Sequence, residues 1–263
     1  MCYTFQVEFE YKKSLGQNFI YDLDFLRSLV KKLNVQPDDV VVEIGAGMGT
    51  LTQVLAENGC QVYSMEVDRR LQPYLSERLE AYPNVQFMFE DALKYDFSKL
   101  PNFRVIANVP YYITTPLIMQ FLALPNCSEL NILIADEVAE RIVEKPGTAL
   151  YGALSVTCQL QAECKILQSV PRALFTPRPK VDSAFVCLKK NDRPYDPKLG
   201  SLLKNIFSAR RKTMMNALSS ALHIDKTTCE QILISVGVDA TSRPEQVTPT
   251  QYAKIYEISR KQG

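Results

Sequence analysis

The sequence predicts an α/β fold in which a doubly wound, mostly parallel sheet is followed by a small all-helical domain. Two observations lead to this prediction. Short apolar runs rich in β-branched residues alternate with helical patterns through the first half of the 263-residue chain, as they do in parallel sheets whose strands are joined by helices. After about residue 189 the pattern is helical throughout. We therefore expect a large domain over residues 1–188 and a small one over residues 189–263.

The strands of the large domain are predicted from short apolar runs. The first of these runs ends at Gly45, and the helix that follows stops at Gly59, a residue type common just past a helix end. The predicted strands cover residues 39–44, 61–67, 84–90, 103–107 and 129–135, and the predicted helices cover residues 50–58, 68–81 and 115–124. Asp68 is expected to cap the second helix, and Pro116 lies early in the third. Two later stretches, 164–168 and 184–189, would extend the sheet.

The small domain is predicted to be helical and basic. A linker-like stretch at residues 191–194 precedes four predicted helices, at 199–207, 212–222, 226–236 and 249–261. Residues 189–263 hold 13 Lys and Arg against 7 Asp and Glu, whereas residues 1–188 hold 17 against 22. Two ordinary solvated surfaces would explain this asymmetry, but it also suits a tail that binds phosphate groups.

Composition excludes several classes of protein. With 46% hydrophobic and 22% charged residues, the chain has the make-up of a globular protein, and it has no apolar run long enough to span a bilayer. Its first ten residues lack a secretory or transit pattern, so we expect a cytoplasmic location. Seven scattered cysteines without a CxxC pair and a single histidine, His223, argue against a metal site or a disulfide framework. No apolar stripe suggests a dimer, and we expect a monomer.

The first strand leads into a glycine-rich turn with the pattern E-x-G-x-G-x-G, at residues 43–49. Glycines here allow a tight turn and a close approach of a ligand to the backbone at Gly45 and Gly47. Glu66, at the end of the second strand, could accept both hydroxyls of a ribose, which suits a dinucleotide and S-adenosylmethionine alike. Asp91 and Ala92 follow the third strand, where a carboxylate could hold an adenine, although Asp91 could instead cap a turn.

The most informative motif is N-V-P-Y, at residues 108–111, directly after the fourth strand. The amino nitrogen of adenine is a poor nucleophile because its lone pair is delocalised into the ring. The side-chain oxygen of Asn108 and the backbone carbonyl of Val109 could accept its two N–H groups and so localise that lone pair. Pro110 has no N–H to compete, and Tyr111 offers a ring for an extruded base. An ordinary Asn-Pro turn is the alternative, but the position behind a glycine-rich turn favours methylation of adenine N6.

Four segments together resemble the rRNA adenine N6,N6-dimethyltransferases. They are the run K-K-S-L-G-Q-N-F-I at residues 12–20, the glycine-rich turn, the N-V-P-Y motif, and F-T-P-R-P-K-V-D-S at residues 175–183. The chain is most similar to the bacterial small-subunit branch of that family, whose tail-domain signature resembles residues 207–216 and whose loop resembles residues 145–152. This branch dimethylates two adjacent adenines in the 3′-terminal hairpin of 16S rRNA.

The resemblance implies a Rossmann-like methyltransferase sheet, S-adenosylmethionine as cofactor, and 16S rRNA in the small ribosomal subunit or its precursor as partner. Gln17, Asn18, Ile20, Gly45, Gly47, Glu66, Asp91, Ala92 and Asn108 would bind the cofactor. Asn108, Val109, Pro110 and Tyr111 would form the target pocket, with Phe175 stacking on the other face of the base. Two departures from the common pattern, Val109 for Leu or Ile and Arg178 for an apolar residue, remove no group that this chemistry needs.

Five basic residues are predicted to contact RNA: Arg178, Lys180, Arg210, Arg211 and Lys212. The last three are expected to open a helix of the small domain. In an arbitrary protein such a cluster is usually a solvated helix end, but an RNA substrate favours phosphate contact. Aromatic residues are sparse around it, which favours recognition of RNA shape over readout of bases.

Three other functions fit parts of the sequence. A 23S rRNA methyltransferase of the sister branch would lack the Arg-Arg-Lys-Thr pattern at residues 210–213. A DNA adenine N6-methyltransferase would need a DNA-recognition domain, for which the tail leaves little room. A non-catalytic ribosome-assembly or transcription factor would not need Glu66, Asp91, Asn108 and Tyr111. A binding role alongside catalysis stays compatible with all of these residues.

Overall fold

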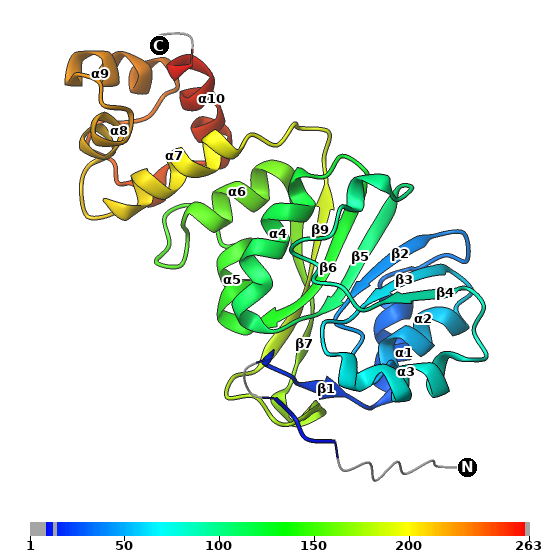
Figure 1. The fold of residues 1–263 in the computed structure, drawn as a ribbon. Coiled ribbons are helices and arrows are strands. Elements are labelled where there is room, and N and C mark those ends of the chain that lie inside the picture. The colour runs from blue at the N-terminus through cyan, green and yellow to red at the C-terminus, as the bar shows by residue number, and fades with distance from the viewer. Residues whose placement is uncertain (1–8, 13–14, 261–263) are drawn as a thin grey trace.

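The computed structural model describes residues 9–12 and 15–260. Its centre is a seven-stranded sheet in the order β4-β3-β2-β5-β6-β9-β7 (Figure 1). The strands are β2 (Val40–Ile44), β3 (Gln61–Met65), β4 (Val85–Met88), β5 (Phe103–Asn108), β6 (Cys127–Ala135), β7 (Ala162–Val170) and β9 (Ser183–Lys190). Neighbours from β4 to β6 are parallel, and β9 runs antiparallel to both β6 and β7. The predicted mostly parallel sheet is confirmed, and so is its extension by the two later strands.

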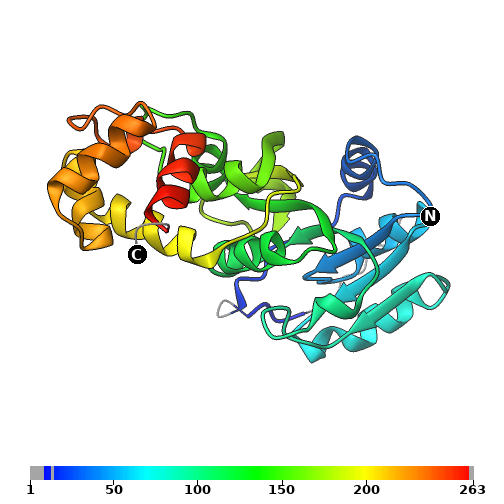
Figure 2. The same ribbon diagram turned by 90° about the horizontal axis from the view of Figure 1, so that it is seen from above.

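Helices cover both faces of the sheet because side chains alternate between its faces along each strand. Val41 packs with α1 (Leu23–Lys32) and α2 (Thr50–Glu57), whereas its neighbour Val42 packs with α4 (Thr114–Ala123) and α5 (Asp136–Val143). The helix α3 (Gln72–Leu79) packs through Leu75 and Leu79 against the glycine-rich turn. Figures 1 and 2 show these helices on the two sides of the twisted sheet.

A short antiparallel pair, separate from the seven-stranded sheet, joins the N-terminal segment to the segment before β9. The strand β1 (Phe19–Ile20) pairs with β8 (Phe175–Thr176), with Ile20 opposite Phe175. The side chains of Ile20 and Phe175 are buried among residues of α1 and α2. This pair brings two segments that resemble family motifs side by side, although about 155 residues separate them along the chain.

The tail consists of α7 (Pro197–Ser208), α8 (Met214–Leu222), α9 (Lys226–Ser235) and α10 (Pro249–Ser259). These helices form the lobe at the upper left of Figure 1. Their core is not closed on itself, since it includes Tyr151 and also Val156 and Leu160 of α6 (Ala153–Gln161). The predicted end of the last helix, Lys261, lies outside the described residues. Within the described part of the chain, no helix is long and apolar enough to cross a membrane.

The prediction that Arg210, Arg211 and Lys212 open a helix is wrong. The helix α7 ends at Ser208, and α8 begins only at Met214. Thr213 caps α8, because its side chain accepts a hydrogen bond from the backbone N–H of Asn216. The three basic residues therefore lie in the loop between the two helices.

Candidate active site

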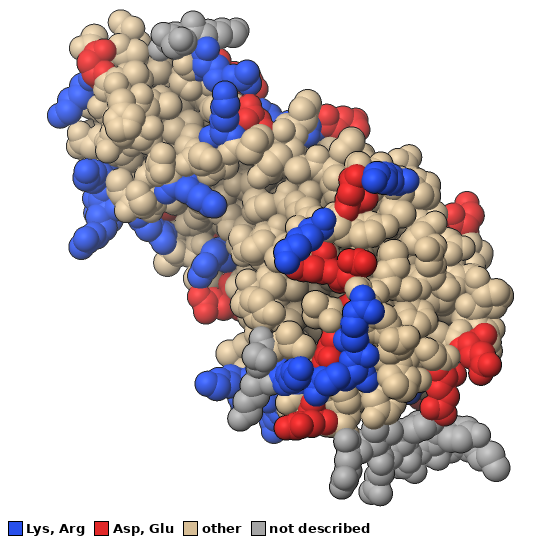
Figure 3. Space-filling view, in the orientation of Figure 1, with Lys and Arg blue, Asp and Glu red and all other residues tan. Residues whose placement is uncertain are grey.

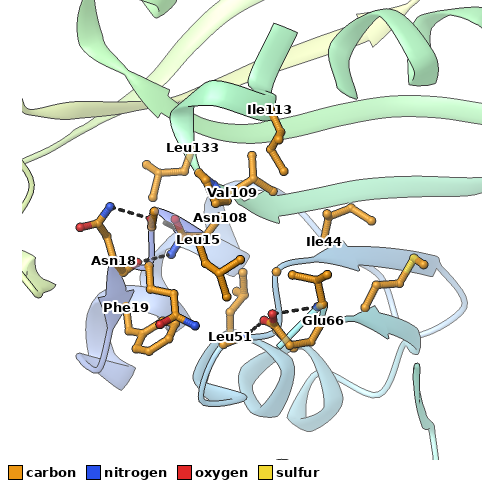
Figure 4. Close-up of a pocket in the computed structure, with 18 of the residues that line it drawn as sticks. Leu15, Asn18, Phe19, Ile44, Leu51, Glu66, Asn108, Val109, Ile113 and Leu133 are labelled. Carbon is orange, nitrogen blue, oxygen red and sulfur yellow. Dashed lines mark hydrogen bonds between the residues drawn. The ribbon is translucent and has the colours of Figure 1, made fainter. Parts of the chain in front are cut away.

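One cavity of about 270 Å³ lies at the carboxyl ends of the central parallel strands. Such edges are the usual ligand sites of open α/β sheets. The cavity is lined by every residue that the sequence assigned to catalysis or to the cofactor: Gln17, Asn18, Ile20, Gly45, Gly47, Glu66, Asp91, Ala92, Asn108, Val109, Pro110, Tyr111 and Phe175. Figure 4 shows Asn18, Glu66 and Asn108 around this cavity. The fold thus brings together four segments that are far apart along the chain.

The glycine-rich turn touches the N-V-P-Y motif directly. Gly45 has a positive φ of 83°, and the backbone N–H groups of Gly45 and Ala46 both donate to the carbonyl of Met65. A Cβ atom at Gly45 would lie 2.7 Å from the backbone oxygen of Asn108, which is too close for any side chain. Glycine at this position therefore lets the two motifs share one cavity.

Glu66 supports the turn as well as facing the cavity. Its carboxylate accepts three backbone hydrogen bonds, from Gly47 at 2.9 Å, Val67 at 2.8 Å and Asp68 at 2.9 Å. Burial raises the pKa of this carboxyl, and the three amide donors oppose that rise. Oε1 accepts from both Val67 and Asp68, whereas Oε2 accepts only from Gly47, so Oε2 keeps a lone pair that can accept a hydroxyl from a ligand.

Asn108 is held by a chain of amide bonds. Its Nδ2 donates to the carbonyl of Asn18 at 3.2 Å, and Nδ2 of Asn18 donates to the carbonyl of Gly16 at 3.0 Å (Figure 4). Since Nδ2 is engaged, Oδ1 is the group of the same amide that remains to accept a hydrogen bond. The N-terminal segment therefore orients Asn108 as an acceptor.

Tyr111 is fixed by a residue whose role the sequence did not reveal. Its hydroxyl lies 2.7 Å from Oγ of Ser183, the first residue of β9. Ser183 is fully buried and Tyr111 is partly buried, and burial raises the pKa of the tyrosine hydroxyl. Ser183 closes the segment F-T-P-R-P-K-V-D-S, and its place in that segment was the only signal. Phe175 lines the same cavity but is only 4% exposed, since it also packs in the core.

Gln17 contacts the rest of the protein through Asp68. Its Nε2 donates to Oδ2 of Asp68 at 2.8 Å, and its Oε1 accepts from the backbone N–H of Lys12 at 2.8 Å. Arg70 forms an ion pair with the same carboxylate at 2.6 Å and holds the pKa of Asp68 below its usual range. Asp68 was expected only to cap the helix at residues 68–81; it caps the 3-10 turn Arg69–Leu71 that precedes α3, through the backbone N–H of Arg70.

Asp91 lines the cavity and also caps a turn. It lines the cavity beside Ala92, and its Oδ1 accepts a hydrogen bond from the backbone N–H of Leu93 at 3.0 Å. This bond caps a turn, which is the other role that the sequence allowed for Asp91. The second oxygen lies 3.4 Å from Nζ of Lys94. Asp91 therefore stabilises a turn at the edge of the cavity.

The predicted RNA-contacting residues lie away from the cavity lining. Arg178 and Lys180 are exposed on the loop between β8 and β9, and Arg211 and Lys212 are exposed before α8. Arg210 differs, because it donates to the carbonyl of Thr148 at 3.2 Å and lies 3.7 Å from the carboxylate of Glu245. Figure 3 shows Lys and Arg side chains gathered on the lower-left flank of the tail helices.

The described residues contain no group of His, Cys, Asp and Glu side chains arranged to hold a metal ion. His223 ends α8 in the left-handed conformation, with a φ of 58°. His223 thus ends a helix and does not line the cavity.

A family model described as ribosomal RNA adenine dimethylase matches residues 8–261. The chain belongs to this family. The ribosomal RNA small subunit methyltransferase A of Alkaliphilus oremlandii is 42% identical over 263 residues, which cover 94% of this chain and 91% of the relative. The protein of the same name from Shouchella clausii is 40% identical, with 94% and 89% covered. The family predicted from the four motifs is confirmed, and these relatives support its small-subunit type.

Solved structures agree with the fold. A dimethyladenosine transferase from Plasmodium falciparum superposes with a TM-score of 0.83, at 24% identity, over 93% of this chain and 98% of that one. The 23S rRNA methyltransferase ErmE superposes with a TM-score of 0.71, at 27% identity, over 91% and 98%. The Rossmann-like methyltransferase sheet with C-terminal helices is therefore confirmed.

Proposed function

We propose that this protein transfers methyl groups from S-adenosylmethionine to N6 of adenine in the RNA of the small ribosomal subunit. The orientation of Asn108 is the observation that supports this chemistry most directly. Its Nδ2 is bound to Asn18, so its Oδ1 is left as an acceptor in a cavity that also holds a cofactor turn. Membership of the family and the names of the relatives support the substrate.

The residues of the cavity fit S-adenosylmethionine. Glu66 would accept the ribose hydroxyls, and Gly45 and Gly47 would line the cradle for the cofactor with backbone alone. Asn18 and Ile20 would contact its methionine end beside Gln17, and Asp91 with Ala92 would border its adenine. The bound cofactor would supply a methyl group on a positively charged sulfur.

The target adenine would enter beside Asn108. Oδ1 of Asn108 and the carbonyl of Val109 would each accept one N–H of the adenine amino group, which localises the nitrogen lone pair toward the methyl carbon. Pro110 fixes this carbonyl in place, since its own φ is restricted. Tyr111 and Phe175 would stack on the two faces of the extruded base. A general base is not required, because the proton can leave to water once the N–C bond has formed.

We further propose that residues 1–188 act as the catalytic domain and residues 189–263 as the RNA-binding domain. Phosphate groups would be contacted by Arg178, Lys180, Arg211 and Lys212. Arg210 would contact phosphate while keeping its contacts with Thr148 and Glu245. The substrate would be two adjacent adenines in the 3′-terminal hairpin of 16S rRNA, within the small subunit or its precursor. A monomeric state and a cytoplasmic location remain predictions.

The test is mass mapping of methylated adenines after incubation of the protein, labelled cofactor and undermethylated small-subunit particles. The wild type is expected to produce dimethyladenine at two neighbouring positions near the 3′ end of the small-subunit RNA. Label in 23S rRNA alone, or in DNA, would contradict the proposed substrate.

Asn108→Ala is expected to reduce methyl transfer by about a hundred- to a thousandfold, because it removes an acceptor that acts on the reacting nitrogen. Calorimetric affinity for S-adenosylmethionine should change less than about threefold. Thr227→Ala, an exposed change on α9, serves as the control for handling and folding. Wild-type rates in Asn108→Ala would disprove the mechanism.

A further inference from the structure

We propose that Tyr112 forms a stacking site for the nucleobase next to the target adenine, which rests on the proposed function. Tyr112 lines the cavity and is 65% exposed. A large ring that remains open to solvent at the mouth of a cavity is a ready platform for a base. Neither the family motifs nor the mechanism above uses this residue.

Exposed apolar side chains gather at this cavity. In the described part of the chain, the large apolar residues that remain exposed are Tyr21, Val67, Leu93, Tyr112, Ile166, Val181 and Ile234. Three of them, Val67, Leu93 and Tyr112, line the one cavity. Val67 and Leu93 follow Glu66 and Asp91 on the cofactor side. Tyr112 is the member of this group that lies on the target side, next to the N-V-P-Y motif.

The local backbone separates two neighbouring tyrosines. Residues Tyr111–Ile113 form a 3-10 turn, closed by a hydrogen bond from the N–H of Ile113 to the carbonyl of Pro110 at 3.1 Å. Within this turn the hydroxyl of Tyr111 is tied to Ser183, whereas the ring of Tyr112 stays exposed at the cavity rim. One ring can therefore serve the extruded base and the other a base outside the cavity.

An extruded nucleotide leaves a gap in its strand, so the neighbouring base loses a stacking partner. An aromatic ring at the rim can replace that partner, and such stacking tolerates any base. Ser183 is bound to Tyr111 and ends the exposed loop that carries Lys180. Lys180 is thus three residues before the serine that fixes the turn, and it would supply a cation for the RNA backbone.

The first experiment compares Tyr112→Ala, Tyr112→Phe and the wild type in methyl transfer to undermethylated small-subunit particles. Base–aromatic stacking predicts that Tyr112→Ala raises KM for the particles about tenfold or more. Tyr112→Phe should stay within about twofold of the wild type, because the ring and not the hydroxyl stacks. Affinity for S-adenosylmethionine alone should be unchanged. Ile166→Ala removes an exposed apolar side chain (37%) on β7, outside both the cavity lining and the tail, and should leave KM unchanged.

The second experiment uses the absence of tryptophan from the sequence. Tyr112→Trp introduces a single indole at the rim, and its fluorescence is expected to be quenched when particles bind, since it stacks on a base. Ile166→Trp places the same fluorophore on β7, outside the cavity lining and the tail, where quenching should be weaker.

An unchanged KM in Tyr112→Ala, an equal loss in Tyr112→Phe, or no quenching in Tyr112→Trp would overturn the inference. Weakened cofactor affinity in Tyr112→Ala would also overturn it, by placing the ring in the cofactor site. Failure of the proposed function is distinguishable, because the wild type itself would then produce no dimethyladenine in these particles.

Discussion

At the scale of single residues, the glycine-rich turn depends on a buried carboxyl that does not line the cavity. Glu43 is fully buried, and its Oε2 accepts hydrogen bonds from the hydroxyls of Thr52 at 2.6 Å and Ser64 at 2.5 Å. Burial raises its pKa to about 7, the two hydroxyls oppose the rise, and the nearby charge of Glu66 adds to it. Glu43 thus links β2, α2 and β3 beneath the turn. Its contribution to the stability of the fold depends on pH.

The first prediction follows from the sign of this shift. In the unfolded chain Glu43 loses its proton near pH 4.5, whereas in the folded protein it keeps the proton to about pH 7. Its contribution to stability is therefore complete below pH 4.5 and is lost as the pH rises to about 7. Glu43→Gln carries no titratable group at this site. The difference between its free energy of unfolding and that of the wild type should therefore change in favour of the variant from pH 5 to pH 8, by at most about 3 kcal/mol.

Urea denaturation of both proteins at these two pH values measures the difference. Glu57→Gln, which changes a carboxyl of α2 whose pKa is lowered, should not show this gain. A constant difference between Glu43→Gln and the wild type would mean that Glu43 is charged throughout this range.

At the scale of elements, the segment before β1 acts as a strap along the cavity. Leu15, Gly16, Gln17 and Asn18 line the cavity, and the strap is held at Asp68 by Gln17 and at β8 by strand pairing. Asp68 is only 5% exposed, so the hydrogen bond from Gln17 reaches a buried charge. Hydrogen bonds to charged groups are worth more than neutral ones.

Gln17→Ala is therefore expected to loosen the strap and to raise Kd for S-adenosylmethionine roughly three- to thirtyfold. Isothermal titration calorimetry measures the change. Gln36→Ala removes an exposed glutamine outside the cavity lining and is the matched control. Equal affinities in Gln17→Ala and the wild type would show that the strap does not depend on Asp68.

The elements that could be predicted from the sequence are those whose hydrophobic pattern lies within one short stretch of the chain. The central strands were predicted correctly, because they are buried on both faces and read as continuous apolar runs. The sequence-based prediction assigned no element to α1, α5 or α6, although Asp22 caps α1 and carries a local signal. The pairing of β1 with β8 involves two residues in each strand, far apart in sequence. No periodicity can reveal a contact of that kind.

The candidate site shows the same division. The glycine-rich turn, Glu66 and the N-V-P-Y motif could be placed at strand ends, because each lies at the end of a predicted strand or directly after it. The bond between Tyr111 and Ser183, and the bond between Gln17 and Asp68, join residues 72 and 51 positions apart. Such contacts depend on the folded arrangement, so the sequence could name these residues without their partners.

At the scale of the whole molecule, the loop between α5 and α6 is bonded to the tail helices and their connections. In residues 144–152, the N–H of Gly147 donates to the carbonyl of Glu245 at 2.7 Å, and the hydroxyl of Tyr151 donates to the carbonyl of Val247 at 2.9 Å. Arg210 adds its bond to the carbonyl of Thr148. With the apolar core that α6 shares with the tail, these bonds hold the two parts in one arrangement.

The basic cluster at residues 210–212 should therefore divide into two roles. Arg211→Gln combined with Lys212→Gln removes two exposed charges, and the slope of log K against log salt for binding to small-subunit particles should fall by about 1 to 2. The melting temperature should not change, since neither side chain is buried. Arg210→Gln removes the contacts with Thr148 and Glu245, and it should lower the melting temperature by about 2–4 °C.

Filter binding from 50 to 300 mM salt and differential scanning calorimetry separate these roles. Lys226→Gln, a single exposed charge at the start of α9, controls for loss of net charge away from the cluster. An unchanged slope in the double variant would mean that Arg211 and Lys212 are ordinary solvated side chains that do not contact RNA. An unchanged melting temperature in Arg210→Gln would mean that the shared core alone fixes the tail, because the polar contacts of the loop then add nothing measurable to it.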